Sequence, residues 1–146
     1  MAKHIAVAGN IGAGKTTLTH LLSKHYGWEV QLEDMDDNPY ISDFYEDMQR
    51  WSFNLQVYFL NARFSQIIDI RKGKHTVVQD RTIYEDAIFA KTLRDMELMD
   101  PRDYETYVNL FRNLSNFMCR PNVIIYLDVT PEESMERIQQ RSRGCE

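Results

Sequence analysis

The stretch Gly9-Asn10-Ile11-Gly12-Ala13-Gly14-Lys15-Thr16 decides how the rest of the chain is interpreted. It matches G-x-x-x-x-G-K-[ST], the pattern of a loop whose backbone N–H groups surround phosphate oxygens. The glycines let the backbone turn sharply, and a helix beginning at the loop adds its unpaired N–H groups and its positive dipole end. The motif assigns Lys15 to the β- and γ-phosphates and the Thr16 hydroxyl to Mg²⁺.

The flanks of this loop predict the structure that such a motif requires. Residues 3–8 form a β-rich run that predicts a buried strand, and residues 17–24 place Leu18, Leu21 and Leu22 on one helical face. A glycine-rich turn without a ligand is the simpler alternative. A dinucleotide-binding loop does not fit, because Thr17 stands where that pattern needs Gly or Ala.

Length and composition set the broad class. The 146 residues suit one domain, and 43% hydrophobic with 27% charged residues is ordinary for a globular protein. The net charge of −5 argues against a general nucleic-acid-binding protein. Cys119 and Cys145 lack metal-ligand spacing, so free thiols are expected. No apolar run of membrane-spanning length and no signal peptide is seen, so we expect a cytoplasmic protein.

Strand and helix patterns alternate along the remaining chain. Strands are predicted at residues 28–32, 74–79 and 122–129, and helices at 40–48, 50–70, 83–94, from 101 and from 131. Asp100-Pro101 is a helix-start signal, and Thr130-Pro131-Glu132-Glu133 is a capping box at the start of the last predicted helix. The helix from 101 has an apolar stripe that predicts a core or subunit contact, at Tyr104, Tyr107, Val108, Phe111, Leu114 and Met118. The run 122–129 is uniformly apolar, which predicts a strand in the interior of a parallel sheet. This alternation predicts an α/β fold with helices on both faces of the sheet.

Two polar side chains stand out within the apolar helix predicted at residues 50–70. Gln56 and Arg63 are seven residues apart, so they lie on one face at a spacing of about 10 Å. Burial of an amide or a guanidinium without a partner costs several kcal/mol. Each therefore needs a partner, either a ligand or another side chain.

Charged residues follow the predicted strands at the positions where open α/β sheets bind ligands. Glu33 closes the second strand, and Asp80 and Arg81 close the third. Glu85 and Asp86 begin the next helix, where acidic side chains also suit the helix dipole.

Taken together, these motifs resemble the deoxynucleoside kinases, the P-loop family that phosphorylates deoxyribonucleosides at the 5′-hydroxyl. Asn38-Pro39-Tyr40 and Asp80-Arg81-Thr82 with Glu85-Asp86 look most like the bacterial deoxyadenosine/deoxyguanosine kinase branch. The other matching positions are residues 9–17, Glu33, Tyr45-Glu46, Arg50-Trp51-Ser52-Phe53, Gln56, Arg63, Arg137, Arg141 and Arg143.

The resemblance implies a role for each of these positions. Glu33 resembles the base beside the 5′-hydroxyl, and Arg81 and Lys15 complete the catalytic set. Thr16 and Asp80 would hold Mg²⁺. The resemblance places ATP at the phosphate loop and at three arginines of a lid, namely Gly9, Asn10, Ile11, Gly12, Ala13, Gly14, Lys15, Thr16, Thr17, Arg137, Arg141 and Arg143. Without the resemblance, the three arginines also fit a basic helix end exposed to solvent. The nucleoside would bind at Glu33, Tyr45, Gln56, Arg63, Arg81, Asp86 and Glu146.

The sequence departs from the family pattern at four places. Asp34 follows Glu33 where most members have proline, Asp80 and Thr82 replace Glu and Ser, and Ala90 stands where relatives carry an aromatic residue.

The sequence given ends at residue 146, whereas the family continues through further helices and a fifth strand. We therefore expect an incomplete single P-loop kinase domain, with a three-layer α/β/α sandwich of strand order 2-3-1-4. We also expect an exposed apolar fourth strand, poor solubility and little activity of these residues alone.

The resemblance implies transfer of the ATP γ-phosphoryl group to a deoxynucleoside in nucleotide salvage, and a purine (deoxyadenosine or deoxyguanosine) is the expected acceptor. The resemblance also implies a homodimer, and no nucleic acid polymer or membrane as a partner. Two alternatives remain open. One is a nucleoside-monophosphate kinase of the thymidylate type, and the other is a non-catalytic nucleotide-binding fragment.

Overall fold

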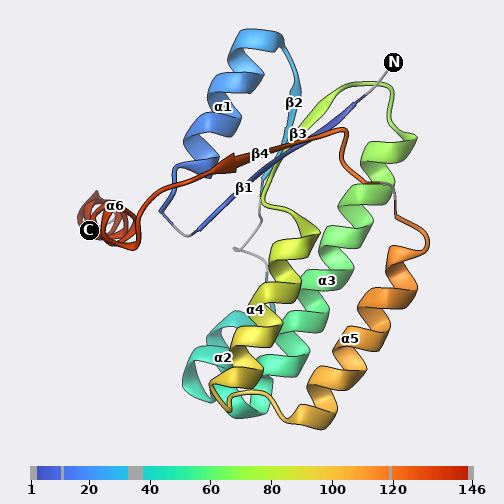
Figure 1. Ribbon diagram of the computed structural model, residues 1–146, viewed down its shortest axis with the longest axis vertical. Coiled ribbons are helices and arrows are strands. Elements are labelled where there is room, and N and C mark those ends of the chain that lie inside the picture. Colours follow the sequence, from blue (N-terminus) through green and yellow to red (C-terminus); the bar gives the residue numbers. More distant parts are fainter. Residues whose placement is uncertain (1–2, 11, 33–37, 119, 145–146) are drawn as a thin grey trace. The chain divides into compact units, whose positions relative to one another are not determined.

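A computed structural model of the chain describes residues 3–10, 12–32, 38–118 and 120–144. The chain forms two compact units, and each is described by itself (Figure 1). The first unit comprises residues 1–33, 73–82 and 121–146, and the second comprises residues 34–72 and 83–120.

The first unit is built on a parallel sheet. Its strands pair in the order β2-β3-β1-β4, with His4 opposite Val77 and Ile5 opposite Val123. The predicted strand order 2-3-1-4 is therefore confirmed. The elements are β1 (His4–Gly9), α1 (Lys15–Tyr26), β2 (Glu29–Gln31), β3 (Val77–Asp80), β4 (Val123–Leu127) and α6 (Pro131–Gly144).

The core of the first unit lies between β1, β3 and helix α1. All six residues of β1 are buried, and Val7 and Val78 are fully enclosed. Leu18 and Leu22 of α1 pack against this core as predicted. The prediction for Leu21 was wrong, because this side chain is 59% exposed. The buried side of α1 is instead completed by Thr19, whose hydroxyl donates to the Lys15 carbonyl oxygen at 2.6 Å.

Strand β4 differs from its predicted place in the sheet interior. Among the strands that the structure describes it pairs with β1 alone, and Val123, Ile124 and Tyr126 are 48%, 51% and 67% exposed. The expected exposed apolar edge is therefore present in the described part of the sheet. An apolar run indicates that a strand suits burial, but it does not indicate which elements cover it.

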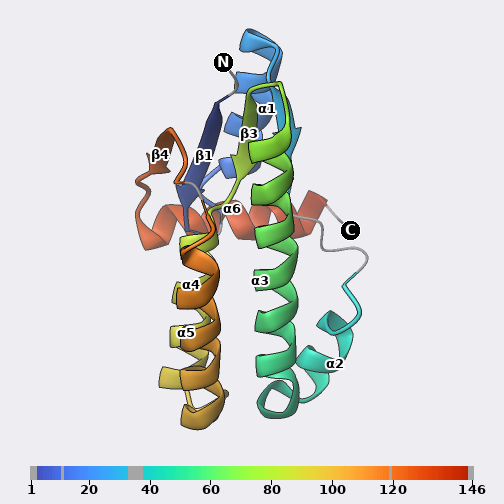
Figure 2. The same ribbon diagram turned by 90° about the vertical axis from the view of Figure 1, so that its right-hand side faces the viewer.

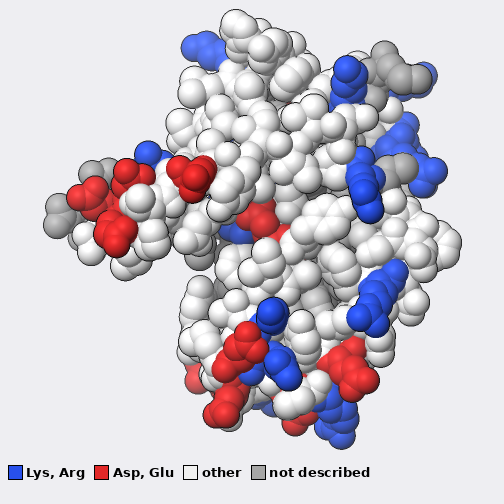
Figure 3. Space-filling view, viewed as in Figure 1, with Lys and Arg blue, Asp and Glu red and all other residues white. Residues whose placement is uncertain are grey.

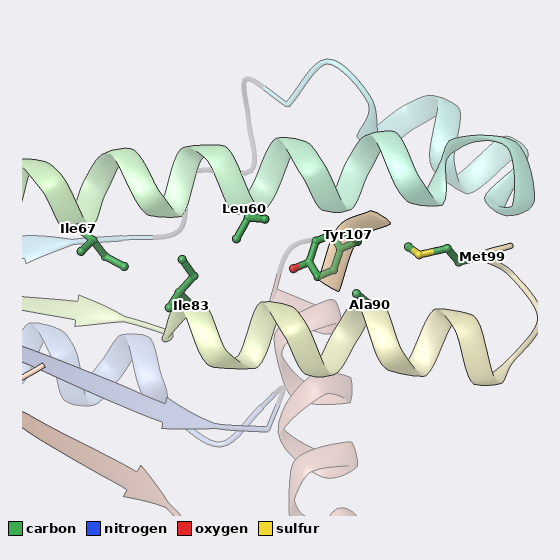
Figure 4. Close-up of a cluster of buried hydrophobic side chains, with 6 residues drawn as sticks. All are labelled: Leu60, Ile67, Ile83, Ala90, Met99 and Tyr107. Carbon is green, nitrogen blue, oxygen red and sulfur yellow. The ribbon is translucent and has the colours of Figure 1, made fainter. Parts of the chain in front are cut away.

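The second unit is a group of helices. Its elements are α2 (Ile41–Glu46), α3 (Met48–Lys72), α4 (Ile83–Asp95) and α5 (Pro101–Ser115). Helices α3, α4 and α5 lie side by side (Figures 1 and 2). Their shared core contains the buried residues Leu60, Ile67, Ile83, Ala90, Met99 and Tyr107 (Figure 4).

Helix α3 (Met48–Lys72) buries one continuous face in this core. The buried stripe on this face consists of Ser52, Leu55, Gln56, Leu60, Arg63, Ile67 and Ile70, spaced three or four residues apart. Its two long polar members, Gln56 and Arg63, therefore lie among apolar neighbours.

Two helix starts follow their sequence signals. The Asp100 side chain accepts a hydrogen bond from the Arg102 backbone N–H at 2.8 Å, which caps α5 as predicted. Thr130 and Glu133 form the reciprocal capping box of α6: the Glu133 N–H donates to the Thr130 hydroxyl oxygen and the Thr130 N–H to the Glu133 carboxylate. The predicted apolar stripe of α5 also packs into the core, at Tyr104, Tyr107, Val108, Phe111, Leu114 and Met118.

Candidate functional site

The loop between β1 and α1 has the backbone conformation that its glycines permit. Gly12 and Gly14 have φ angles of +79° and +96°, and Gly14 is the N-cap residue immediately before α1. A Cβ atom at Gly12 would lie 2.6 Å from the Ser134 carbonyl oxygen of α6. Gly12 is therefore required both by its φ angle and by the close approach of α6.

Lys15 places its ammonium group against this loop. The side chain is buried, and Nζ donates to the carbonyl oxygens of Gly9 and Asn10 at 2.8 Å each. A buried ammonium needs such acceptors. These contacts hold the charge at the loop, where the motif predicts that phosphate oxygens bind.

Thr16 and Asp80, the two predicted metal ligands, are brought together. The Thr16 hydroxyl donates to Asp80 Oδ2 at 2.5 Å, and Asp80 is buried at the end of β3. In the described ranges there is no group of three or more His, Cys, Asp or Glu that would form a closed metal site. Two hard oxygen groups suit Mg²⁺, which usually keeps water and phosphate oxygens as its other ligands.

Arg81 has an unusual backbone. Its φ angle is +82°, its N–H donates to the Val7 carbonyl oxygen at 2.9 Å, and its side chain is buried. A non-glycine residue in this region costs of order 1–3 kcal/mol and is often found at functional sites. The strain at Arg81 supports its candidacy independently of the motif.

Of the three predicted lid arginines, only Arg137 has a described side chain. Its Nη1 donates to the Ala13 carbonyl oxygen at 2.7 Å, which brings α6 onto the phosphate loop. Arg141 and Arg143 lie within α6, but their side chains are outside the described part of the chain. Ile11, Glu33 and Glu146 also lie outside the described residues, so their predicted roles stay predictions.

In the second unit, Arg63 pairs with another side chain. Its Nε lies 3.1 Å from Asp86 Oδ2, and both side chains are 4% exposed. Arg63 Nη1 also donates to Gln66 Oε1 at 3.4 Å. The structure thus gives Arg63 a side-chain partner in a buried ion pair, and of the two acids that begin α4, Asp86 is the buried one.

Gln56 behaves differently from Arg63. It is 5% exposed, yet its Oε1 has no hydrogen-bond partner among the described residues. An unsatisfied buried amide oxygen is costly. Within the described structure, Gln56 is thus a candidate ligand-binding residue, as the sequence predicted.

Two other predicted positions have different surroundings. Tyr45 lies on α2 and is 67% exposed, with its ring against Phe44 at a centroid distance of 5.5 Å. Ala90 is fully buried in the core of the second unit, beside the Tyr107 ring (Figure 4).

Tyr107 carries a polar group that the sequence pattern did not indicate. Its place in the apolar stripe of α5 predicted a core residue, and the ring is 1% exposed. Its hydroxyl, however, has no hydrogen-bond partner among the described residues. Burial and, to a lesser extent, the negative charge of Asp86 raise the pKa of this hydroxyl above its ordinary value. An amphipathic pattern cannot reveal such a group, because it treats tyrosine as apolar.

The surface carries charges of both signs. Figure 3 shows lysine and arginine interspersed with aspartate and glutamate over the helices of the second unit, and acidic side chains on α6. Among the helices that the structure describes, none has the length and apolar composition needed to cross a membrane.

The chain is similar in sequence to known deoxynucleoside kinases. Residues 5–146 match the family described as "Deoxynucleoside kinase". The chain is 54% identical to a deoxyadenosine kinase of Dictyostelium discoideum, over 98% of this chain and 58% of that protein. It is 46% identical to a deoxyadenosine/deoxycytidine kinase of Bacillus subtilis, over 97% of this chain and 67% of that protein.

The fold is also that of solved members. The structure of deoxyadenosine kinase from M. mycoides with bound dATP is similar at a TM-score of 0.84 and 34% identity, covering 95% of this chain and 71% of that one. The chain thus spans a little over half the length of the Dictyostelium relative. The family predicted from the motifs is confirmed: this chain belongs to the deoxynucleoside kinases and has their P-loop fold.

Proposed function

We propose that the protein containing this chain transfers the γ-phosphoryl group of ATP to the 5′-hydroxyl of a deoxynucleoside, with deoxyadenosine as its preferred acceptor. The observation that carries this proposal is the buried Gln56 amide oxygen without a described partner. Gln56 lies on the same stripe of α3 as Arg63, which pairs with Asp86 of α4. Such a set of groups suits the edge of a nucleobase.

Adenine and cytosine each present an amino group next to a ring nitrogen that accepts a hydrogen bond. The Gln56 amide can accept from that amino group through Oε1 and donate to the ring nitrogen through Nε2. Turned over, the same amide would match the carbonyl oxygen and ring N–H of guanine or thymine, so it does not select the base by itself. The Asp86 carboxylate, which only accepts when ionised, favours an amino group over a carbonyl oxygen. The names of the Dictyostelium and Bacillus relatives, which include deoxyadenosine and deoxycytidine, support this choice.

The phosphate-binding groups of the first unit support the transfer step. Phosphoryl transfer depends mainly on positioning and on neutralising charge at the phosphate oxygens. We assign that task to the loop N–H groups and to Lys15, Arg81 and Arg137. Mg²⁺, if held by Thr16 and Asp80, would supply further positive charge to the β- and γ-phosphates.

The remaining roles rest on the family resemblance. We assign to Glu33 the acceptance of the 5′-hydroxyl proton, to Tyr45 and Glu146 the sugar 3′-hydroxyl, and to Arg141 and Arg143 the ATP phosphates. We also propose that the protein is a cytoplasmic homodimer acting in nucleotide salvage, and that residues 1–146 belong to one kinase domain.

The Gln56→Ala variant tests this proposal. Loss of a paired donor and acceptor is worth about 1–3 kcal/mol, so KM for deoxyadenosine should rise about tenfold or more. KM for ATP should stay within about twofold, because Gln56 is not assigned to the phosphates. Steady-state kinetics with the full-length protein measure both constants.

Gln49→Ala is the matched control. Gln49 lies on the same helix α3 but is exposed, with only a weak contact from its side chain to the Glu97 carbonyl oxygen at 3.4 Å. Its KM for deoxyadenosine should equal that of the wild type. An unchanged KM for deoxyadenosine in Gln56→Ala would show that Gln56 does not contact the base.

A further inference from the structure

The second unit contains a second buried polar group that the proposed contacts do not use. The Tyr107 hydroxyl has no hydrogen-bond partner among the described residues, although its residue is the largest fully buried side chain described. A buried hydroxyl without a partner is unfavourable relative to one that is paired, because it has lost its hydrogen bonds to water. Its presence in a well-packed core therefore needs an explanation.

The surroundings of Tyr107 connect it to the groups assigned to the base. Its ring lies between α3 and α4, and its hydroxyl points along the core toward Leu60 and Ile83, away from Met99 (Figure 4). Gln56 and Arg63 flank Leu60 on the buried stripe of α3, one turn before it and about one turn after it.

Asp86 occupies the corresponding place on α4. It lies between Ile83 and Ala90, three residues after the first and four before the second, and all three are buried. The negative charge of Asp86 contributes, after burial, to raising the pKa of the Tyr107 hydroxyl. The phenol is therefore neutral near pH 7 and is available as a hydrogen-bond donor.

We propose that Tyr107 is a further substrate-binding residue, whose hydroxyl donates a hydrogen bond to an acceptor nitrogen of the bound adenine. This inference rests on the proposed function. It explains why α5 carries a tyrosine rather than a phenylalanine at a position that is otherwise entirely apolar. It adds a donor from a third helix to the groups supplied by α3 and α4.

The Tyr107→Phe variant isolates the hydroxyl, because the ring that fills the core is kept. Without ligand, its Tm should equal or slightly exceed that of the wild type, since an unpaired buried hydroxyl is removed. With deoxyadenosine, its Kd by titration calorimetry and its KM should both rise about fivefold, while kcat changes less than about twofold. Unchanged Kd and KM, or a lowered Tm without ligand, would overturn the proposal.

Deoxyadenosine analogues locate the acceptor. The 1-deaza, 3-deaza and 7-deaza compounds each lack one ring nitrogen. The penalty of Tyr107→Phe should disappear with the single analogue that lacks the nitrogen contacted by the hydroxyl. An equal penalty with all three analogues would show that the hydroxyl does not contact an acceptor nitrogen of the base, which overturns the proposal.

Tyr104→Phe is the matched control. Tyr104 lies on the same helix, one turn before Tyr107, but is only partly buried, and Arg94 lies over its ring at 5.6 Å. Its Kd for deoxyadenosine should be unchanged. If the wild-type protein binds deoxyadenosine but does not phosphorylate it, the proposed kinase activity is contradicted, while the Kd values still test the role of Tyr107. If the wild-type protein does not bind deoxyadenosine, both the proposed activity and the proposed role of Tyr107 are contradicted.

Discussion

Among single residues, the buried polar side chains carry most of the functional information. Lys15, Arg63 and Asp80 are all buried and all have polar partners, as a folded protein requires. The oxygens of Gln56 and Tyr107 are buried without partners among the described residues. The first group positions charge inside the protein, and at the second group we propose that a ligand binds.

The buried pair of Arg63 and Asp86 leads to a prediction about stability. Asp86→Ala should lower the free energy of unfolding by about 3–5 kcal/mol, because it leaves the Arg63 guanidinium buried without its carboxylate. The double variant Arg63→Met/Asp86→Ala should recover part of that loss, since no unpaired charge remains. Urea unfolding measures both. A cost below about 1 kcal/mol for the single variant would show that the pair is not buried in solution.

His4 leads to a prediction about pH. Burial lowers the pKa of its imidazole, and the hydrogen bond between Nε2 and Gln79 Oε1 at 2.8 Å opposes this shift only in part. The folded state therefore resists protonation more than the unfolded state, whose pKa is about 6.5. The contribution of neutral His4 to stability is complete above about pH 6.5 and decreases as the pH falls below it.

The His4→Gln variant removes this proton-binding site. Between about pH 7.5 and pH 5.5, the wild type should lose more unfolding free energy than the variant. The comparison cancels the carboxylates that both proteins share. Equal losses in denaturant titrations at the two pH values would contradict the lowered pKa.

At the scale of elements, the contact between the phosphate loop and α6 is the most sensitive feature of the first unit. Ser134 of α6 approaches Gly12 too closely for any side chain, and Arg137 of α6 donates to the carbonyl oxygen of Ala13. The last helix therefore fixes the loop through backbone packing as well as through charge.

Gly12→Ala should weaken ATP binding about tenfold or more. The added Cβ would meet the Ser134 carbonyl oxygen at 2.6 Å, and an L-residue at this φ angle costs about a further 1–2 kcal/mol. Gly27→Ala is the control, because its φ angle of +72° is similar but an added Cβ would meet no described atom within 4 Å. It should reduce stability by about 1 kcal/mol and leave the Kd for ATP unchanged. An equal loss of ATP affinity in both variants would contradict the role of the α6 contact.

The elements also show what could be predicted from the sequence. The phosphate loop and the capped starts of α5 and α6 were predicted correctly, because each depends on local residue chemistry or on a motif with fixed geometry. The order of the strands, which places β4 at an edge, came from the family resemblance, whereas the apolar pattern alone placed β4 in the sheet interior. The exposure of Leu21 was not predicted, because it depends on which other elements cover a surface. Arg63 needed a partner on physical grounds, but only the packing of α4 on α3 identifies Asp86.

For the molecule as a whole, two units carry different parts of the proposed chemistry. The first unit contains the phosphate loop, Asp80 and Arg81, and the second contains Gln56, the Arg63–Asp86 pair and Tyr107. The phosphate-loop pattern indicated Lys15 and Thr16, because phosphate binding requires particular residues at fixed spacing. The roles of Asp80, Arg81, Gln56, Arg63 and Asp86 were implied by the family resemblance. A polar contact by Tyr107 was not predicted, because the apolar pattern of the helix counts tyrosine as an apolar residue. Glu33 and Glu146 lie outside the described residues, so their assignment rests on the family.

The central claim is the transfer of a phosphoryl group to the 5′-hydroxyl of a deoxynucleoside that carries an amino group on its base. The most direct measurement gives the full-length protein Mg²⁺, ATP and, in separate reactions, an equimolar mixture of the four deoxynucleosides or of their four 5′-monophosphates, and identifies the products by mass spectrometry. We predict that deoxyadenosine 5′-monophosphate forms first and in step with ADP, followed by deoxycytidine 5′-monophosphate. Formation of diphosphates alone, or of ADP without any new nucleotide, would contradict the claim.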